Sequence, residues 1–220
     1  MDFLGVLMLQ TRFPRLPGDI GHAGSFGMPV RHRVVTGATP QRVVREGDPA
    51  LIAPFVDAGR ALVAEGARAL TTSCGFLARW QAELQAALPV PVWTSALLWL
   101  PELAALRPGV VTVDGAALDA AVLRAAGVRA DVPVQGIAPD SALARTLLQD
   151  RPELDAAAAE ASVVDAARAL CAAHPATGVI VLECTNMPPY RDAVERTCHR
   201  PVHDIMTLVH ARWSALRERA

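Results

Sequence analysis

Two stretches of this chain are built alike, and each carries one cysteine at the same place. An apolar run ends in Cys74 in the first stretch and in Cys184 in the second, 110 residues later in a chain of 220. A Pro-Val pair stands 17 residues beyond each cysteine, at Pro91 and at Pro201. A repeat over half the chain predicts two related lobes, each of which offers one thiol from the end of a strand.

Short apolar runs alternate with helical patterns along both halves. The predicted strands span residues 5–9, 31–35, 68–73, 90–94, 110–113, 132–137, 179–183 and 202–204, and the predicted helices span residues 49–66, 76–88, 97–106, 116–126, 141–149, 153–173, 188–197 and 205–219. Such alternation is typical of parallel sheets with helices on both faces. The expected fold is α/β, with two pseudo-symmetric lobes, each a short, mostly parallel sheet flanked by helices, and the active site in the cleft between them.

The lobe boundary is expected near residues 107–111. Residues 1–107 then form an N-terminal lobe with Cys74, residues 108–220 form a C-terminal lobe with Cys184, and the last helix can pack back on the first lobe. Asp48 as N-cap and Pro49 at the first position predict a helix start. Residues 10–30, rich in Pro and Gly, predict a long loop that is either functional or mobile.

The composition narrows the classes of partner. The net charge is −1, and the 21 basic residues are all arginines scattered along the chain, which argues against a nucleic-acid footprint. The apolar runs fall far short of the roughly 18–20 residues that cross a bilayer. The N-terminus lacks the basic leader of a signal peptide, and the cysteines show no disulfide spacing. We therefore expect a cytoplasmic protein that binds a small molecule, with no membrane and no nucleic-acid partner.

The two matched cysteines carry the predicted chemistry. In parallel α/β sheets, ligands bind beyond the carboxyl ends of the strands, where Cys74 and Cys184 are expected. Each cysteine precedes a predicted helix, whose free N–H groups and partial positive charge lower the pKa of a thiol. Short polar side chains beside the thiols suit the binding of a carboxylate or an enolate oxygen. These candidate substrate-binding residues are Thr72, Ser73, Thr185 and Asn186.

A purely structural role is the alternative for every cysteine. Most free cysteines are small buried hydrophobic residues, and a single one would be interpreted in that way. Two at matched places, flanked by Ser, Thr and Asn, favour chemistry. Cys171 and Cys198 lack this setting, and we interpret both as packing residues.

The residues around both cysteines resemble the aspartate/glutamate racemase superfamily, which includes hydantoin racemases, maleate isomerases and arylmalonate decarboxylases. Residues 183–186, Glu-Cys-Thr-Asn, are similar to its Gly-Cys-Thr motif at the second cysteine. Residues 73–76, Ser-Cys-Gly-Phe, stand at the place of its first-cysteine motif. Residues 11–19, 71–76 and 183–190 are similar to a branch labelled only by the family name.

The resemblance covers the whole chain and implies a cofactor-independent enzyme, with a homodimer as the family's usual assembly. It implies that one thiolate takes the α-proton and the opposite thiol returns one, which pairs Cys74 with Cys184. The amino-acid racemases carry Asn-Thr after the first cysteine, where Gly75-Phe76 stands here and Gly75 becomes a substrate-binding candidate. They usually carry Glu or His where Asn186 stands. These departures bear on substrate recognition more than on acid–base chemistry.

Two further residues are candidates on their position alone. Arg12 follows the first predicted strand and suits bidentate binding of a carboxylate; a solvated loop over the cleft is the alternative. His203 lies at the end of the strand after the second cysteine and suits a neighbour that orients Cys184; a packing histidine is the alternative. The spacing of Cys198, His199 and His203 matches no standard zinc pattern, so no metal is expected. The absence of lysine excludes a Schiff base with pyridoxal phosphate.

The sequence therefore predicts an isomerase, a racemase or epimerase of a small carboxylate-bearing substrate in amino-acid metabolism, with two-base proton transfer between thiols. The alternatives on the same fold are a carbanion-stabilising lyase or decarboxylase, a maleate-isomerase-like cis–trans isomerase, and a non-catalytic ligand-binding protein. The presence of both thiols argues against the decarboxylase branch, which keeps only the second-lobe cysteine.

Overall fold

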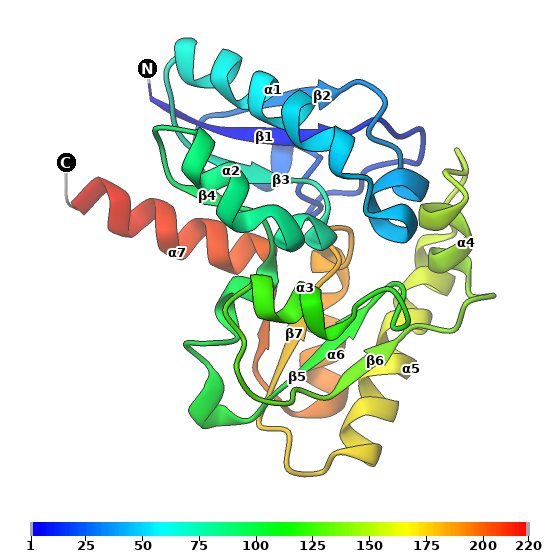
Figure 1. Cartoon of the computed structure of the whole chain (residues 1–220). Helices are drawn as coiled ribbons and strands as arrows, with labels where there is room; N and C mark the ends of the chain where they lie inside the picture. Colours follow the sequence, from blue (N-terminus) through cyan, green and yellow to red (C-terminus); the bar gives the residue numbers. More distant parts are fainter. Residues whose placement is uncertain (1, 219–220) are drawn as a thin grey trace.

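Two four-stranded parallel sheets form the frame of the protein, as described by a computed structural model that covers residues 2–218. The first sheet contains β1 (Phe3–Leu9), β2 (Val30–Val35), β3 (Ala67–Thr72) and β4 (Val92–Trp93), in the order β2-β1-β3-β4. The second contains β5 (Pro108–Thr112), β6 (Val134–Gly136), β7 (Val179–Leu182) and β8 (Val202–His203), in the order β6-β5-β7-β8. The two strand orders are identical, which confirms the predicted α/β fold with two pseudo-symmetric sheets (Figure 1).

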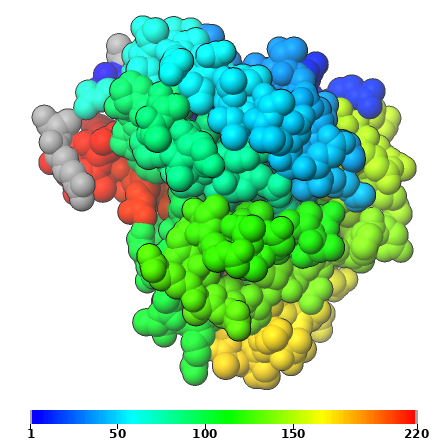
Figure 2. Space-filling model, in the orientation of Figure 1, coloured from blue at the N-terminus to red at the C-terminus, as the bar shows by residue number. Residues whose placement is uncertain are grey.

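The central strands are buried along their whole length because helices cover both faces of each sheet. Every residue of β1, β5 and β7 is buried, as expected for parallel strands that read as continuous apolar runs. The covering helices are α1 (Ile52–Ala64), α2 (Gln81–Ala87), α3 (Ala120–Ala125), α4 (Ala142–Leu148), α5 (Ala156–Ala173), α6 (Arg191–Cys198) and α7 (Ile205–Glu218). Figure 2 shows the blue and cyan first half packed directly on the green and yellow second half.

Shorter helical turns complete the fold and account for the differences from the sequence prediction. They are η1 (Ala23–Ser25), the π-helix η2 (Gln41–Glu46), η3 (Pro49–Leu51), η4 (Gly75–Trp80), η5 (Ala96–Trp99), η6 (Ala104–Leu106) and η7 (Pro188–Tyr190). The predicted helix 97–106 consists of η5 and η6 only, because Pro101 lacks the N–H that a continuous helix needs. The sequence prediction missed η2. Asp48 caps η3 as predicted, since its side chain accepts a hydrogen bond from the Ala50 N–H.

The closing helix α7 contacts the first half of the chain (Figure 1). It packs on η5, where the Trp99 indole N–H donates to the Thr207 hydroxyl at 3.2 Å. Arg212 of α7 pairs with Glu102 of the first half. These contacts add to the sheet-end contacts that hold the two halves together. No helix among residues 2–218 is long and apolar enough to cross a membrane.

Candidate active site

Cys74 and Cys184 line one small cavity between the two sheets. Cys74 follows the carboxyl end of β3 and Cys184 lies two residues beyond the end of β7, so the predicted strand-end placement is confirmed for both thiols. The cavity holds about 30 Å³, which is room for about one water molecule. Its wall also includes Leu9, Phe13, Pro40, Val44, Ser73, Gly75, Phe76, Val113, Leu147, Leu148, Glu183, Thr185 and Asn186. Most of this wall is apolar.

The polar residues beside the cysteines fix the two loops to each other and to the sheet. The Thr185 hydroxyl donates to the Ser73 carbonyl at 2.7 Å, across 112 residues of sequence. The Ser73 hydroxyl accepts from the Leu9 N–H at 2.8 Å. The Thr72 hydroxyl faces the Thr94 and Cys74 carbonyls and is not among the cavity-lining groups. Four of the predicted binding residues therefore line the cavity: Ser73, Gly75, Thr185 and Asn186. Thr72 does not, and its hydroxyl instead links the end of β3 to Thr94, the residue after β4.

A chain of polar contacts leads from Cys184 to the loop after β1. The Cys184 thiol lies 3.7 Å from the Asn186 side-chain oxygen, which accepts its hydrogen bond. The Asn186 amide nitrogen donates to Asp19, and Asp19 forms a buried ion pair with Arg15 at 3.2 Å. Arg15 also stacks on the Phe13 ring, 4.5 Å from its centroid. These contacts fix the Asn186 side chain with its oxygen toward the thiol, so the Cys184 thiol is a hydrogen-bond donor.

Both thiols have raised pKa values, contrary to the prediction that the following helices lower the thiol pKa and favour thiolates. Burial, reinforced by the nearby Glu183 carboxylate, raises the pKa of Cys74 to about 12. The same two causes raise the pKa of Cys184 well above its ordinary value. The N–H groups of Phe76 and Asn186 do lower the pKa of Cys74 and Cys184, respectively, but desolvation outweighs them. Only a short 3-10 helix follows Cys74, which limits the helix-dipole contribution.

Glu183 is a cavity-lining residue that the sequence prediction missed. It is fully buried, and burial raises its pKa to about 7. The Thr112 hydroxyl donates to Oε2 at 2.7 Å, while Oε1 is buried without a hydrogen-bond partner among the described residues. The available signal was a carboxylate at the position where the superfamily motif has glycine.

Arg12 and His203 lie outside the cavity. The Arg12 side chain is 71% exposed and pairs with Asp150, the residue two positions beyond α4, at 3.2 Å. Its assignment to substrate binding stays a prediction that this ion pair disfavours, because the guanidinium already has a carboxylate partner. His203 packs on Trp99, with ring centroids 4.9 Å apart, and burial lowers its pKa. Its assignment as a neighbour of Cys184 also stays a prediction.

Comparison with known proteins identifies the family. No family model matches the chain. Over 91% of its length, the chain is 31% identical to a dimethylsulfoniopropionate lyase of Durusdinium sp. clade D and covers 70% of that protein. It is 30% identical to dimethylsulfoniopropionate lyase 7 of Emiliania huxleyi, over 98% of this chain and 67% of the relative. The chain belongs to the dimethylsulfoniopropionate lyase family.

Solved structures show that this chain shares the fold of the aspartate/glutamate racemases. An allantoin racemase from Klebsiella pneumoniae superposes with a TM-score of 0.68 at 16% identity, over 98% of this chain and 89% of that one. An arylmalonate decarboxylase variant gives 0.63 at 20% identity, over 91% and 86% of the two chains. A structure described as a putative Asp/Glu racemase from Yersinia pestis gives 0.61 at 14% identity, over 100% and 99%. The resemblance to this superfamily is confirmed at the level of the fold, and the relatives in sequence are lyases.

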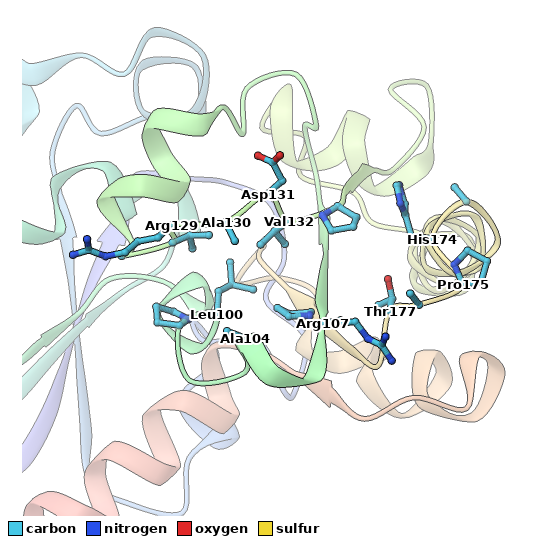
Figure 3. A pocket seen from close by; sticks show the side chains of 17 residues that line it. Leu100, Ala104, Arg107, Arg129, Ala130, Asp131, Val132, His174, Pro175 and Thr177 are labelled. Carbon is cyan, nitrogen blue, oxygen red and sulfur yellow. The ribbon is translucent and has the colours of Figure 1, made fainter.

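A much larger pocket lies at the opposite end of the second sheet, where its strands begin (Figure 3). Its volume is about 830 Å³, and its wall includes Pro108, Pro133 and Thr177, which stand at or just before the amino ends of β5, β6 and β7. None of the site residues predicted from the sequence lines it. In parallel α/β folds, chemistry takes place at the carboxyl ends of the strands, so the small cysteine cavity is the candidate active site of this lyase-family chain despite its size.

Proposed function

We propose that this chain is a carbon–sulfur lyase that acts on dimethylsulfoniopropionate or a sulfonium carboxylate of similar size. The observation that carries the proposal is the pair of thiols on one cavity in a chain at least 30% identical to two dimethylsulfoniopropionate lyases. The lyase, which the sequence analysis named as an alternative, is therefore the first candidate in place of the predicted isomerase. The substrate has a carboxylate at one end and a sulfonium group on the carbon β to it.

The reaction is an elimination that begins at the α-carbon. A thiolate removes the α-proton, the electron pair of that C–H bond forms the α–β double bond, and the β-carbon–sulfur bond breaks. Its electron pair leaves with sulfur, so the products are neutral dimethyl sulfide and acrylate. The proton on the thiol then passes to water, which restores the thiolate. The overall change is one substrate zwitterion to dimethyl sulfide, acrylate and a proton.

The cavity favours Cys74 as the base and Cys184 as a neutral thiol. Arg15 and Arg79 both lower the pKa of Cys74. The Cys184 S–H has the Asn186 oxygen as an acceptor, which stabilises its protonated form. Thiolate formation at Cys74 still needs a positive charge nearby, and a sulfonium substrate supplies that charge itself.

The wall of the cavity suits a sulfonium better than an ammonium. A dimethylsulfonium group has two methyl groups and no N–H donors, so it needs no hydrogen-bond acceptors and packs on apolar and aromatic surfaces. Phe13, Phe76, Leu147 and Leu148 provide such surfaces in the cavity. An α-ammonium group would place three N–H donors in the same apolar surroundings. This contrast favours dimethylsulfoniopropionate over an ordinary amino acid.

Racemisation remains the second candidate because Cys74 and Cys184 approach one cavity from the two different sheets. That arrangement is what removal of a proton on one face and its return on the other require. The two candidates differ in product: a racemase inverts a centre and releases nothing, whereas the lyase releases dimethyl sulfide and acrylate in equal amounts.

The test is turnover of dimethylsulfoniopropionate, with dimethyl sulfide measured in the headspace and acrylate by proton NMR. Replacement of Cys74 by Ala is expected to lower kcat by 10²-fold or more, as for loss of a general base. Cys184→Ala is expected to lower it less. Cys198→Ala, at the end of α6 and outside the cavity, is the matched control and is expected to retain full turnover. Inversion of a chiral carboxylate with no release of dimethyl sulfide would instead assign the racemase.

A further inference from the structure

Glu183 stands between the two cysteine loops, and no charged group among residues 2–218 pairs with it. It follows the last residue of β7 and precedes Cys184, and its N–H donates to the Val111 carbonyl at 2.9 Å. Its carboxyl group reaches the backbone that follows Cys74, because a Cβ built on Gly75 would overlap Glu183 Oε1. One side chain of the second half therefore lies directly against the first-half cysteine loop.

The two carboxyl oxygens of Glu183 have different surroundings. Oε2 accepts the hydrogen bond of the Thr112 hydroxyl, so this oxygen carries no proton of its own toward Thr112. Oε1 is buried without a hydrogen-bond partner among residues 2–218. A buried polar atom without a partner costs about 1–3 kcal/mol. When the carboxyl group is protonated, Oε1 is therefore the oxygen that bears the hydrogen and can donate it to a ligand in the cavity.

We propose that Glu183, in its protonated form, binds the substrate carboxylate through a hydrogen bond from Oε1. The contact strengthens as the α-proton leaves, because negative charge then spreads onto the substrate carboxylate oxygens. Glu183 is thus a catalytic residue that holds the substrate carboxylate. The inference rests on the proposed function, since it assumes that the cysteine cavity takes a carboxylate substrate.

The surroundings of Glu183 favour the neutral carboxyl group. Burial is the larger cause that holds its pKa near 7, and the Thr112 hydroxyl opposes it. The titratable groups nearest to Glu183 in the cavity are Cys74 and Cys184, and the pKa of each thiol is raised. Asp19 raises the pKa of Cys184, whereas Arg15 and Arg79 lower the pKa of Cys74. An ionised Glu183 would raise the pKa of Cys74 and so destabilise its thiolate. A neutral Glu183 can therefore bind the substrate carboxylate, and it does not oppose thiolate formation at Cys74, the proposed base.

The experiment measures binding of propionate, which carries the carboxylate but no leaving group, by isothermal titration calorimetry between pH 5.5 and 8.5. The wild type is compared with Glu183→Gln, which keeps the shape and an N–H donor, and with Glu183→Leu, which keeps neither donor nor acceptor. Thr112→Val removes only the hydroxyl that stabilises the ionised carboxylate. Circular dichroism and thermal unfolding establish that each variant is folded before its binding is measured.

Propionate is expected to bind the wild type tightly at low pH and to lose affinity tenfold per pH unit above about 7, or about thirty-fold by pH 8.5. Glu183→Gln is expected to bind without this dependence, and Glu183→Leu to bind weakly at every pH. In Thr112→Val the loss of affinity is expected to begin at higher pH, because that hydroxyl lowers the pKa of Glu183.

Three results would overturn the proposal: no binding of propionate at pH 5.5, an affinity that does not change with pH in the wild type, or the same loss of affinity in Glu183→Gln. Failure of the lyase function is seen separately in the release of dimethyl sulfide. A protein that shows the predicted propionate profile but releases no dimethyl sulfide keeps the role of Glu183 and loses only the lyase assignment.

Discussion

The Thr185 hydroxyl donates a 2.7 Å hydrogen bond to the carbonyl of Ser73, and this bond joins the two cysteine loops. Ser73 directly precedes Cys74, and Thr185 directly follows Cys184. Both residues are buried, so the carbonyl would have no water to replace the hydroxyl. The separation of the two thiols is thus set in part by one side chain that crosses from one half of the chain to the other.

Replacement of Thr185 by Val is expected to lower the free energy of unfolding by about 1–3 kcal/mol, because a buried carbonyl loses its donor while the side-chain volume is kept. Turnover is expected to fall as well, since the two thiols lose a fixed separation. Urea unfolding and dimethyl sulfide release measure the two effects. Thr185→Ser keeps the hydroxyl and is the control. Equal losses in the Ser and Val variants would show that the hydrogen bond contributes nothing.

The close approach of Gly75 to Glu183 predicts a second sensitive position. In Gly75→Ala the new methyl group would overlap the carboxyl and carbonyl groups of Glu183, so the second-half loop must shift. We expect a loss of about 1–3 kcal/mol in unfolding free energy, as for overpacking of a core, together with a large fall in turnover. Gly27→Ala is the matched control, because a Cβ there meets no atom within 4 Å. Wild-type turnover in Gly75→Ala would contradict the geometry.

The fold was predictable because its signals are local. Short apolar runs between turn residues, such as that of β7, are typical of buried strands. The Asp48-Pro49 pair marks a helix start because the Asp48 side chain caps the Ala50 N–H in the first turn. The errors arise where local patterns compete. The apolar stretch 97–106 predicts one helix, but Pro101 interrupts it. The residues of η2 show no strong helical periodicity of apolar side chains.

The candidate site was predictable only in part because cavity chemistry depends on contacts distant in sequence. The equal spacing around Cys74 and Cys184 indicated that two related elements carry the thiols. No local signal in the sequence shows that Arg12 pairs with Asp150, or that Glu183 lies against Gly75. The direction of the thiol pKa shifts was wrong for the same reason, since burial by the opposite half of the chain outweighs the local N–H groups.

The Arg12–Asp150 contact predicts control of access to the cavity. Asp150 accepts from the Arg12 backbone N–H at 2.6 Å and from its guanidinium at 3.2 Å. It follows α4, whose Leu147 and Leu148 line the cavity. The cavity is smaller than any carboxylate substrate, so part of its wall must move for entry, and we expect the α4 side to be the part that moves. Asp150→Ala is expected to release the wall and speed alkylation of Cys74 and Cys184 by iodoacetamide.

Peptide mass spectrometry measures this labelling at each cysteine over time. A several-fold increase at Cys74 and Cys184, with unchanged labelling of the partly buried Cys171, is the expected result. Asp140→Ala, an exposed aspartate before the same helix, is the control for a change of charge. Equal acceleration at all cysteines would indicate general destabilisation, and no acceleration would show that entry proceeds by another wall.

The raised pKa of Glu183 predicts how stability depends on pH. In the folded protein this pKa is about 7, against 4.5 for the ordinary group, so the folded state binds more protons than the unfolded state between these values. The contribution of Glu183 is therefore most favourable below pH 4.5 and is lost as pH rises through 7, at a cost of about 3 kcal/mol. Glu183→Gln removes this loss, because its amide does not ionise. Thermal unfolding at pH 5 and pH 8.5 is expected to show a higher Tm for Glu183→Gln than for the wild type only at pH 8.5. A parallel decline of both proteins with pH would place the titrating group elsewhere.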